Sequence, residues 1–301
     1  MKTAVNIGSL QLKNPILTAS GTFGNGHEFQ DFMDLNSIGG FCSKGLSMEP
    51  RGGNPEPRIV ETPSGMLNSI GLENGGAKAF LKEVLPKVSH HDMAVIVNIY
   101  AHSLDEFVGL VRYLEQSDRI DAYEMNLSCP NVAEGGAAFG SDAAVVAKLT
   151  QAARNETKKP LIIKLSPNVT DVKEMAKAAQ GAGADAVSLI NTLIGTAIDR
   201  EKRQFILARK VGGLSGPAIK PVALKMVWET VQAVDIPVIG IGGIVSFEDV
   251  LDFLIVGATA VQIGSGNFVN PALAQECAHS LETYLEERNE TIDQLIGSIH
   301  S

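Results

Sequence analysis

The chain has 301 residues, of which 45% are hydrophobic and 20% are charged, and its formal net charge is −9. These proportions are typical of a globular protein with a sizeable core. The negative charge argues against nucleic acid and against an anionic membrane surface as partners, because both attract basic proteins. The length suits either two average domains or one large α/β barrel.

The three cysteines, Cys42, Cys129 and Cys277, lie far apart in the sequence. Their spacing matches neither a disulfide framework nor a metal-ligand cluster, so no metal site is predicted. Free thiols are typical of a reducing cytoplasm. No apolar run reaches the length of a membrane span, and no secretory segment is expected at the N-terminus. We therefore expect a cytoplasmic protein.

Short apolar runs alternate with longer amphipathic stretches along the chain. A small hairpin is expected first, over residues 4–14. Eight continuous apolar runs then follow, at residues 15–20, 39–45, 93–99, 122–128, 160–166, 185–192, 236–243 and 260–266. Continuous, β-branched runs of this length are typical of buried parallel strands.

The amphipathic stretches between these runs predict helices. Ser103 with Glu106, and Ser246 with Asp249, have the spacing of N-terminal capping pairs. Further helices are expected near Ala77 and at residues 141–156, 171–180, 219–234 and 272–288. Eight strand–helix units predict a (β/α)8 TIM barrel, as a single domain over residues 1–301. A doubly wound sheet is the alternative, because a count of strands does not show that a sheet closes.

One connection, residues 46–75, is much longer than the others. Loops of this size in compact domains are usually functional or disordered. The alternation in PRIVETPSGML (57–67) predicts a small hairpin. We therefore expect an ordered insertion over the carboxyl-terminal face of the barrel.

The predicted strands end in polar residues or glycines. In a TIM barrel the active site lies at the carboxyl ends of the strands. These ends carry Ser20, Lys44, Asn98, Asn126, Lys164, Asn191 with Thr192, the Gly242–Gly243 pair, and Gly264 with Ser265. We expect these side chains and glycines to converge on one site.

The glycines after the last two strands indicate a phosphate site. GIGGI and QIGSG follow the seventh and eighth strands, which is the usual phosphate position in this fold. Glycines allow backbone N–H groups to approach phosphate oxygens. Neither segment has the spacing of a dinucleotide fingerprint. A phosphate-bearing cofactor held by barrel loops is therefore favoured over tight turns without a ligand.

Two lysines lie inside apolar runs, where a lysine is costly without a partner. Lys44 or Lys164, placed beside a flavin ring, would stabilise the negative charge that develops at N1 and O2 on reduction. The alternative is a lysine whose charged end reaches water. Asn68, Asn126 and Asn191 carry both donors and acceptors, which suit the edges of a planar heterocycle.

Seven segments resemble the catalytic subunit of family 1 dihydroorotate dehydrogenases. In chain order they are SKGLS, GNPEPR, GMLNSIGL, NLSCPNV, IKLSPNVTD, GIGGI and VQIGSG. NTLIG (191–195) and GGLSGPAIKPVAL (212–224) look more like the NAD-linked class 1B type than the fumarate-linked class 1A type. The resemblance implies a TIM barrel with FMN that oxidises (S)-dihydroorotate to orotate in pyrimidine synthesis.

Two other interpretations of the function remain. Dihydropyrimidine dehydrogenases share NLSCPN and are the alternative among enzymes. A flavin- or phosphate-binding barrel without catalysis is the alternative outside enzymes.

The resemblance also assigns roles to single positions. Cys129, which on its own would pass for a small buried hydrophobe, matches the family's catalytic base. The positions that match FMN contacts are Ser20, Lys44, Gly45, Asn98, Asn126, Lys164, Ile190, Gly216, Gly242, Gly243, Gly264 and Ser265. The positions that match orotate contacts are Lys44, Asn68, Ser69, Ile70, Gly71, Leu72, Asn126, Asn191 and Thr192. The class 1B type further implies a partner subunit with FAD and a [2Fe–2S] cluster, in a heterotetramer built on a homodimer of catalytic chains.

Overall fold

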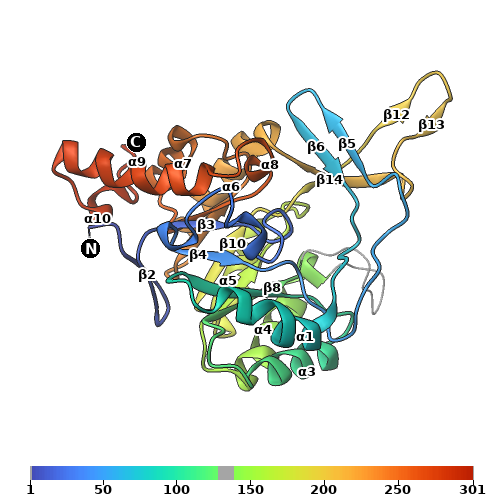
Figure 1. The fold of residues 1–301 in the computed structure, drawn as a ribbon, viewed down its shortest axis with the longest axis horizontal. Helices are drawn as coiled ribbons and strands as arrows, with labels where there is room; N and C mark the ends of the chain where they lie inside the picture. The colour runs from blue at the N-terminus through green and yellow to red at the C-terminus, as the bar shows by residue number, and fades with distance from the viewer. Residues whose placement is uncertain (1, 128–138, 301) are drawn as a thin grey trace.

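The computed structural model describes residues 2–127 and 139–300, and its centre is a closed barrel of eight parallel strands (Figure 1). These strands are β3 (Ile16–Thr18), β4 (Gly40–Cys42), β7 (Ala94–Ile99), β8 (Ala122–Asn126), β9 (Leu161–Lys164), β10 (Ala186–Leu189), β15 (Val238–Ile241) and β16 (Ala260–Ile263). Each pairs with the next along the chain, and β16 closes on β3. The predicted TIM barrel is confirmed, and the closure excludes a doubly wound sheet.

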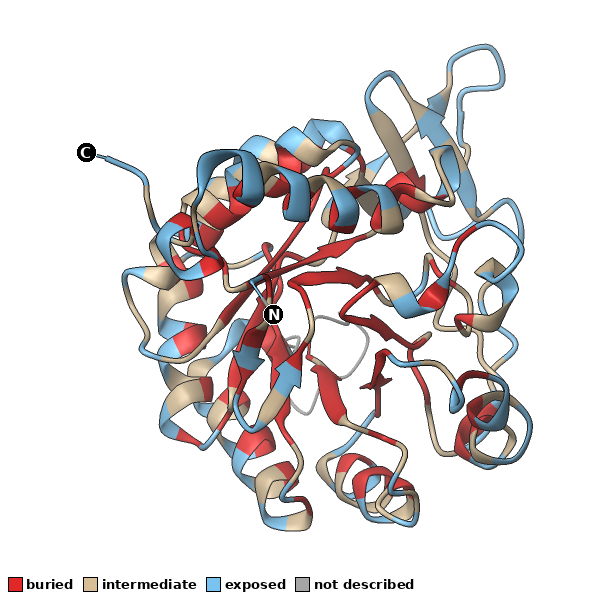
Figure 2. Cartoon of the chain, turned by 60° about the vertical axis from the view of Figure 1, so that its left-hand side comes forward, coloured by how far each residue is buried: buried red, intermediate tan, exposed pale blue. Residues whose placement is uncertain are grey.

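Helices surround the barrel and turn their buried faces towards the strands (Figure 2). The longer ones are α3 (Leu104–Leu114), α4 (Ala143–Glu156), α5 (Val172–Gly181), α6 (Lys220–Val231), α7 (Phe247–Ile255) and α9 (Leu273–Arg288). Short helical segments are η1 (His27–Phe29), η2 (Leu35–Ser37), α1 (Gly76–Ala79), η3 (Phe80–Val84), α2 (Leu85–Val88), η4 (Phe139–Ser141), η5 (Pro217–Ile219), α8 (Gly266–Val269) and α10 (Ile292–Leu295). No helix within the described ranges is long and apolar enough to cross a bilayer.

The two predicted capping pairs are confirmed. The Ser103 hydroxyl accepts a hydrogen bond from the Glu106 backbone N–H at the start of α3. Ser246 and Asp249 form a reciprocal capping box at the start of α7. Each pair satisfies backbone donors that a helix N-terminus otherwise leaves free.

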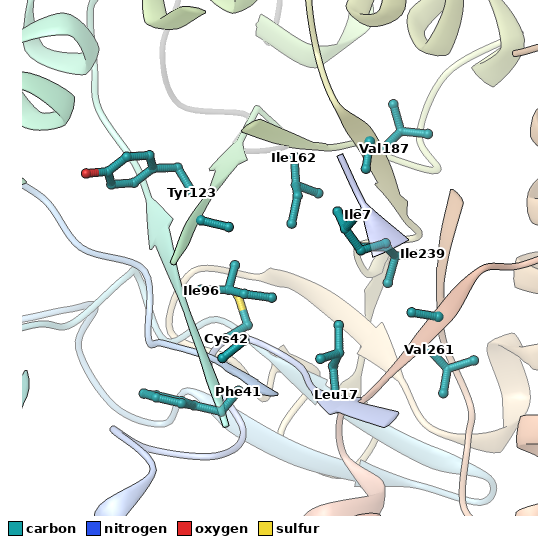
Figure 3. Packing of buried hydrophobic residues seen from close by; sticks show 14 of the residues in the cluster. Ile7, Leu17, Phe41, Cys42, Ile96, Tyr123, Ile162, Val187, Ile239 and Val261 are labelled. Atoms are coloured by element: carbon teal, nitrogen blue, oxygen red, sulfur yellow. The ribbon is translucent and has the colours of Figure 1, made fainter. Parts of the chain in front are cut away.

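The predicted N-terminal hairpin is also confirmed, as β1 (Val5–Ile7) and β2 (Leu10–Leu12). Ile7 is fully buried and lies beside Ile239 of β15 (Figure 3). Gly8, in the turn, has a φ of +57° and packs against Asp185, which directly precedes β10. The hairpin therefore covers the end of the barrel where the strands begin.

The predicted insertion hairpin forms and belongs to a larger sheet beside the barrel (Figure 1). Strands β5 (Ile59–Thr62) and β6 (Gly65–Asn68) pair as expected. The chain after β10 adds β11 (Leu193–Thr196) and β14 (Val211–Ser215), giving the antiparallel order β11–β14–β6–β5. A further small hairpin, β12 (Ile198–Asp199) with β13 (Gln204–Phe205), extends from it. The sequence did not indicate strands β11 to β14.

Candidate active site

The predicted site residues gather at the carboxyl-terminal end of the barrel. Within the described ranges they lie at strand ends, directly after them, or in the inserted sheet. Cys129, the predicted catalytic base, lies outside the described residues. Its place in the site therefore stays a prediction.

The asparagine and threonine positions predicted to contact the substrate lie close together. Asn191, after β10, donates from its Nδ2 to Asn126 Oδ1 at the end of β8, over 3.4 Å. Asn68 donates from β6 to the backbone carbonyl of Gly213 on β14, also over 3.4 Å. Gly213 in turn packs against the Thr192 side chain, so closely that a Cβ there would lie 2.0 Å from Thr192 Oγ1. The inserted sheet thus brings Asn68 to the barrel mouth.

Asn54 fixes the loop of residues 69–72 that follows β6. Its backbone N–H donates to Ile70 O, and its side-chain amide donates to Ser69 O, both over 2.9 Å. Gly71 has a φ of +80°, and a Cβ there would lie within 2.6 Å of the Asn54 side chain. Only glycine suits this position, which explains its place in the motif.

Leu72 at the end of this loop reaches the end of β4. A Cβ on Gly45 would lie 3.3 Å from Leu72 Cδ2 and 3.0 Å from Asn98 Oδ1. The Asn98 oxygen is buried and has no hydrogen-bond partner within the described ranges, and a side chain at position 45 would crowd it. The glycine therefore leaves room beside a buried acceptor near the end of β7.

The predicted phosphate glycines differ in how much space surrounds them. Gly242 and Gly243 follow β15 with φ values of +131° and +75°. Gly243 packs against Lys220 and the carbonyl of Gly216, and Gly242 against the side chains of Ala223 and Ile190. At Gly264, after β16, only Ala19 Cβ would lie within 4 Å of an added Cβ, at 3.8 Å. Of these three glycines, Gly264 is therefore the one with space beside it for a ligand of phosphate size.

The two predicted lysines differ in their surroundings. Lys164 is 5% exposed, and its Nζ lies 3.4 Å from Glu124 Oε1. The alternative of a lysine reaching water is therefore wrong for Lys164. Lys44 is half-buried, and its ammonium meets no carboxylate within the described ranges.

Glu124 is the residue that the sequence analysis missed. It is fully buried on β8 and points into the barrel. Its carboxylate receives contacts from five other strands: Cys42 on β4, Asn98 on β7, Lys164 on β9, Ser188 on β10 and Gln262 on β16. The barrel interior below the candidate site is thus organised around one carboxylate.

Burial alone would raise the pKa of the Glu124 carboxyl, because a charge is poorly solvated there. The Lys164 ammonium, together with hydrogen bonds from Gln262, Ser188 and Cys42, outweighs burial and holds the pKa below its ordinary value. Burial and the Glu124 charge raise the pKa of the Cys42 thiol well above its ordinary value. Glu124 is therefore ionised, and Cys42 remains a neutral thiol whose S–H donates a hydrogen bond to Glu124 Oε1.

Comparison with known proteins identifies the family. The profile of the dihydroorotate dehydrogenase family matches residues 2–285. This chain belongs to the dihydroorotate dehydrogenase family. The resemblance of the seven segments is thereby confirmed.

Individual relatives carry a more specific name. The chain is 54% identical to the "Dihydroorotate dehydrogenase B (NAD(+)), catalytic subunit" of Trichlorobacter lovleyi, over 98% of each chain. It is 54% identical to the protein of the same name from Geotalea uraniireducens, over 98% of this chain and 97% of the relative. The Bacteroides fragilis protein of that name is 48% identical over 98% of each chain. The NAD-linked type, rather than the fumarate-linked type, is the one to which these relatives belong.

Proposed function

We propose that this chain is the FMN-binding catalytic subunit of an NAD-linked dihydroorotate dehydrogenase, which oxidises (S)-dihydroorotate to orotate in pyrimidine synthesis. The observation that carries the proposal is the buried Lys164 ammonium at the end of β9, which contacts the same Glu124 oxygen as Asn98, in a chain of this family. A buried cation at a barrel mouth suits a ring that gains negative charge on reduction.

The residues at the mouth fit FMN in three respects. Lys164 has N–H groups beyond the one that faces Glu124, and these suit the acceptors at N1 and O2 of the ring. Asn98 Oδ1 is buried and has no hydrogen-bond partner within the described ranges, which suits the N3–H donor. The open backbone at Gly264 suits the phosphate. These side chains and glycines match the donor and acceptor pattern of the cofactor.

The chain's own residues would hold the two ligands as follows. The FMN would be held by Ser20, Lys44, Gly45, Asn98, Asn126, Lys164, Ile190, Gly216, Gly242, Gly243, Gly264 and Ser265. The substrate would be held by Lys44, Asn126, Asn191 and Thr192 from the barrel and by residues 68–72 from the insertion. Cys129 would remove the proton from C5 of dihydroorotate as a thiolate. When bound, FMN supplies the acceptor for the hydride that leaves C6.

The proposal extends to assembly and location. Each catalytic chain would form one domain, and two such chains would form a homodimer. Each catalytic chain would also bind one partner subunit that carries FAD and [2Fe–2S]. This heterotetramer would work in the cytoplasm. The relatives' printed name, "catalytic subunit", supports a separate partner.

An anaerobic titration of the FMN-loaded chain tests the proposed reaction. We expect dihydroorotate to bleach the flavin absorbance band stoichiometrically, because the substrate reduces the cofactor directly. Dihydrouracil is the matched control and should leave the band unchanged. Bleaching by dihydrouracil alone would favour a dihydropyrimidine dehydrogenase, and no bleaching by either compound would favour a barrel without catalysis.

We expect Lys164→Ala to weaken FMN binding roughly 10- to 100-fold, since a hydrogen bond to a charged group contributes about 1.5–3 kcal/mol. The variant should also lower the flavin's reduction potential, because the reduced ring loses its counter-charge. FMN fluorescence on dilution measures the affinity, and a dye equilibrium measures the potential. Lys173→Ala, on the outer helix α5, is the control. Unchanged affinity and potential in Lys164→Ala would remove Lys164 from the cofactor site.

A further inference from the structure

The buried Glu124–Lys164 pair has a feature that the proposed FMN contacts do not explain. The other side chains that contact the Glu124 carboxylate are uncharged, so this ammonium and this carboxylate are direct counter-charges. Their 3.4 Å separation is longer than a close ion pair of about 2.7–2.9 Å. An ammonium carries three N–H groups, and the contact with Glu124 uses at most one.

Glu124 also sets the orientation of two buried amides. Asn98 Nδ2 lies 2.7 Å from Glu124 Oε1, and Gln262 Nε2 lies 2.7 Å from Glu124 Oε2. An ionised carboxylate only accepts hydrogen bonds, so each amide must turn its NH2 group towards it. The Asn98 and Gln262 oxygens therefore point away from Glu124, and both lack a partner within the described ranges.

The orientation of Asn98 matters at the barrel mouth. Its oxygen is buried, and a Cβ on Gly45 would lie 3.0 Å from it, so the glycine leaves room beside it. Lys164 contacts the same carboxylate oxygen as the Asn98 amide, Glu124 Oε1, and has further N–H groups to donate. Glu124 thus turns the Asn98 acceptor away from itself and holds the Lys164 donor nearby, and this pattern would complement the N3–H and C2=O edge of a flavin.

The charge of Glu124 would act on the same ring if FMN is bound there. Reduction of a flavin places negative charge at its N1 and O2, which the Lys164 ammonium would stabilise and the nearby Glu124 carboxylate would oppose. Screening is weak in the buried barrel interior, so this opposition persists at ordinary salt.

We propose that Glu124 is a positioning residue for the cofactor, which directs the Lys164 ammonium and the Asn98 oxygen to the flavin and lowers the flavin's affinity for electrons. The inference rests on the proposed FMN binding but concerns a residue outside the predicted FMN contacts. A flavin that holds electrons less tightly passes them on more readily to the next acceptor.

Glu124→Gln tests the charge with little change of shape. We expect the equilibrium constant for reduction of bound FMN, measured against a reference dye, to rise about tenfold or more, because a buried negative charge is lost. FMN binding should weaken, because a Gln amide no longer fixes the Asn98 and Gln262 orientations. Glu124→Asp keeps the charge and should stay near the wild-type constant. Glu282→Gln, which removes an exposed carboxylate from α9, should leave both measurements unchanged.

A double variant tests the same inference if Glu124→Gln alone fails to fold because Lys164 is left without its counter-charge. Lys164→Gln with Glu124→Gln removes both buried charges together. Relative to Lys164→Gln alone, the double variant should again show an equilibrium constant about tenfold higher. An unchanged constant in every FMN-loaded Glu124→Gln variant would overturn the inference. Loss of the folded state from both the single and the double variant, measured by circular dichroism, would also overturn it, because Glu124 would then serve folding alone.

The outcome for the wild-type chain separates this inference from the proposed function. A wild-type chain that binds no FMN, or whose FMN is not reduced by dihydroorotate, refutes the proposed function. A wild-type chain that is reduced normally, beside Glu124 variants with unchanged equilibrium constants, refutes only the role of Glu124.

Discussion

Cys129→Ala is expected to bind FMN and orotate normally while its flavin is reduced by dihydroorotate about 10² to 10⁴ times more slowly than in the wild type. A positioned base typically contributes a factor of this size. Alanine removes the proton acceptor without adding bulk, so the binding of both ligands should remain. Stopped-flow reduction of the loaded enzyme measures the rate, and orotate-induced changes in the flavin spectrum measure the binding.

Cys129→Ser and Cys277→Ala are the matched variants for comparison with Cys129→Ala. A serine hydroxyl is a far weaker base than a thiolate, whose ordinary pKa is about 8.5, so Cys129→Ser should retain slight activity that rises towards high pH. Cys277 lies on α9, where burial, followed by nearby acidic side chains, raises the pKa of its thiol to about 12, so Cys277→Ala should reduce flavin at the wild-type rate. A normal rate in Cys129→Ala would show that another group removes the proton.

The barrel was predictable from the sequence because its strands are apolar on both faces. The six residues of β7 (Ala94–Ile99) are all buried, since one face packs on helices and the other fills the barrel. Such runs stand out without any knowledge of pairing partners. The helix starts at Ser103 and Ser246 could also be predicted, because the two residues of a capping pair are close together in the sequence.

The second sheet was not predictable by the same means. Strand β14 contains Gly212 and Gly213, and its burial is uneven, so it lacks the apolar run that marks a barrel strand. It is held by pairing with β6, as in the register Leu214 with Leu67, across almost half the chain. Contacts between such distant segments leave no local pattern. The hairpin of β5 and β6 was recognised only because its two strands are adjacent.

Glu124 shows the same limit inside the site. Glu124 is a charged residue inside the apolar run AYEMNLS, just as Lys44 and Lys164 are charged residues inside apolar runs. The sequence could therefore have indicated Glu124 as a candidate site residue. That five side chains contact its carboxylate could not be predicted. They come from five different strands, and only the structure shows how those strands are aligned across the barrel. Sequence indicates a costly buried charge, and geometry shows what compensates it.

The second large effect concerns the electron acceptor. The purified chain, loaded with FMN and supplied with dihydroorotate, is expected to reduce NAD at least about 100-fold more slowly than it reduces an artificial dye. No segment of the sequence has the dinucleotide fingerprint that NAD binding in a Rossmann fold requires. Three scattered cysteines also cannot supply the four ligands of an iron–sulfur cluster. We therefore expect the chain to require the proposed partner for passing electrons from FMN to NAD.

Adding the proposed partner subunit, which is expected to carry FAD and [2Fe–2S], should restore rapid NAD reduction, while the rate with the dye should change little. Fumarate, offered to the chain alone, is the matched test of the rival acceptor. Rapid fumarate reduction, or efficient NAD reduction by the chain without added protein, would contradict the need for a partner. The relatives' name supports the NAD-linked outcome.

A flavin with a low reduction potential, which Glu124 is proposed to maintain, would favour electron transfer from FMN towards NAD. Glu124→Gln in the assembled enzyme should therefore slow NAD reduction more than dye reduction.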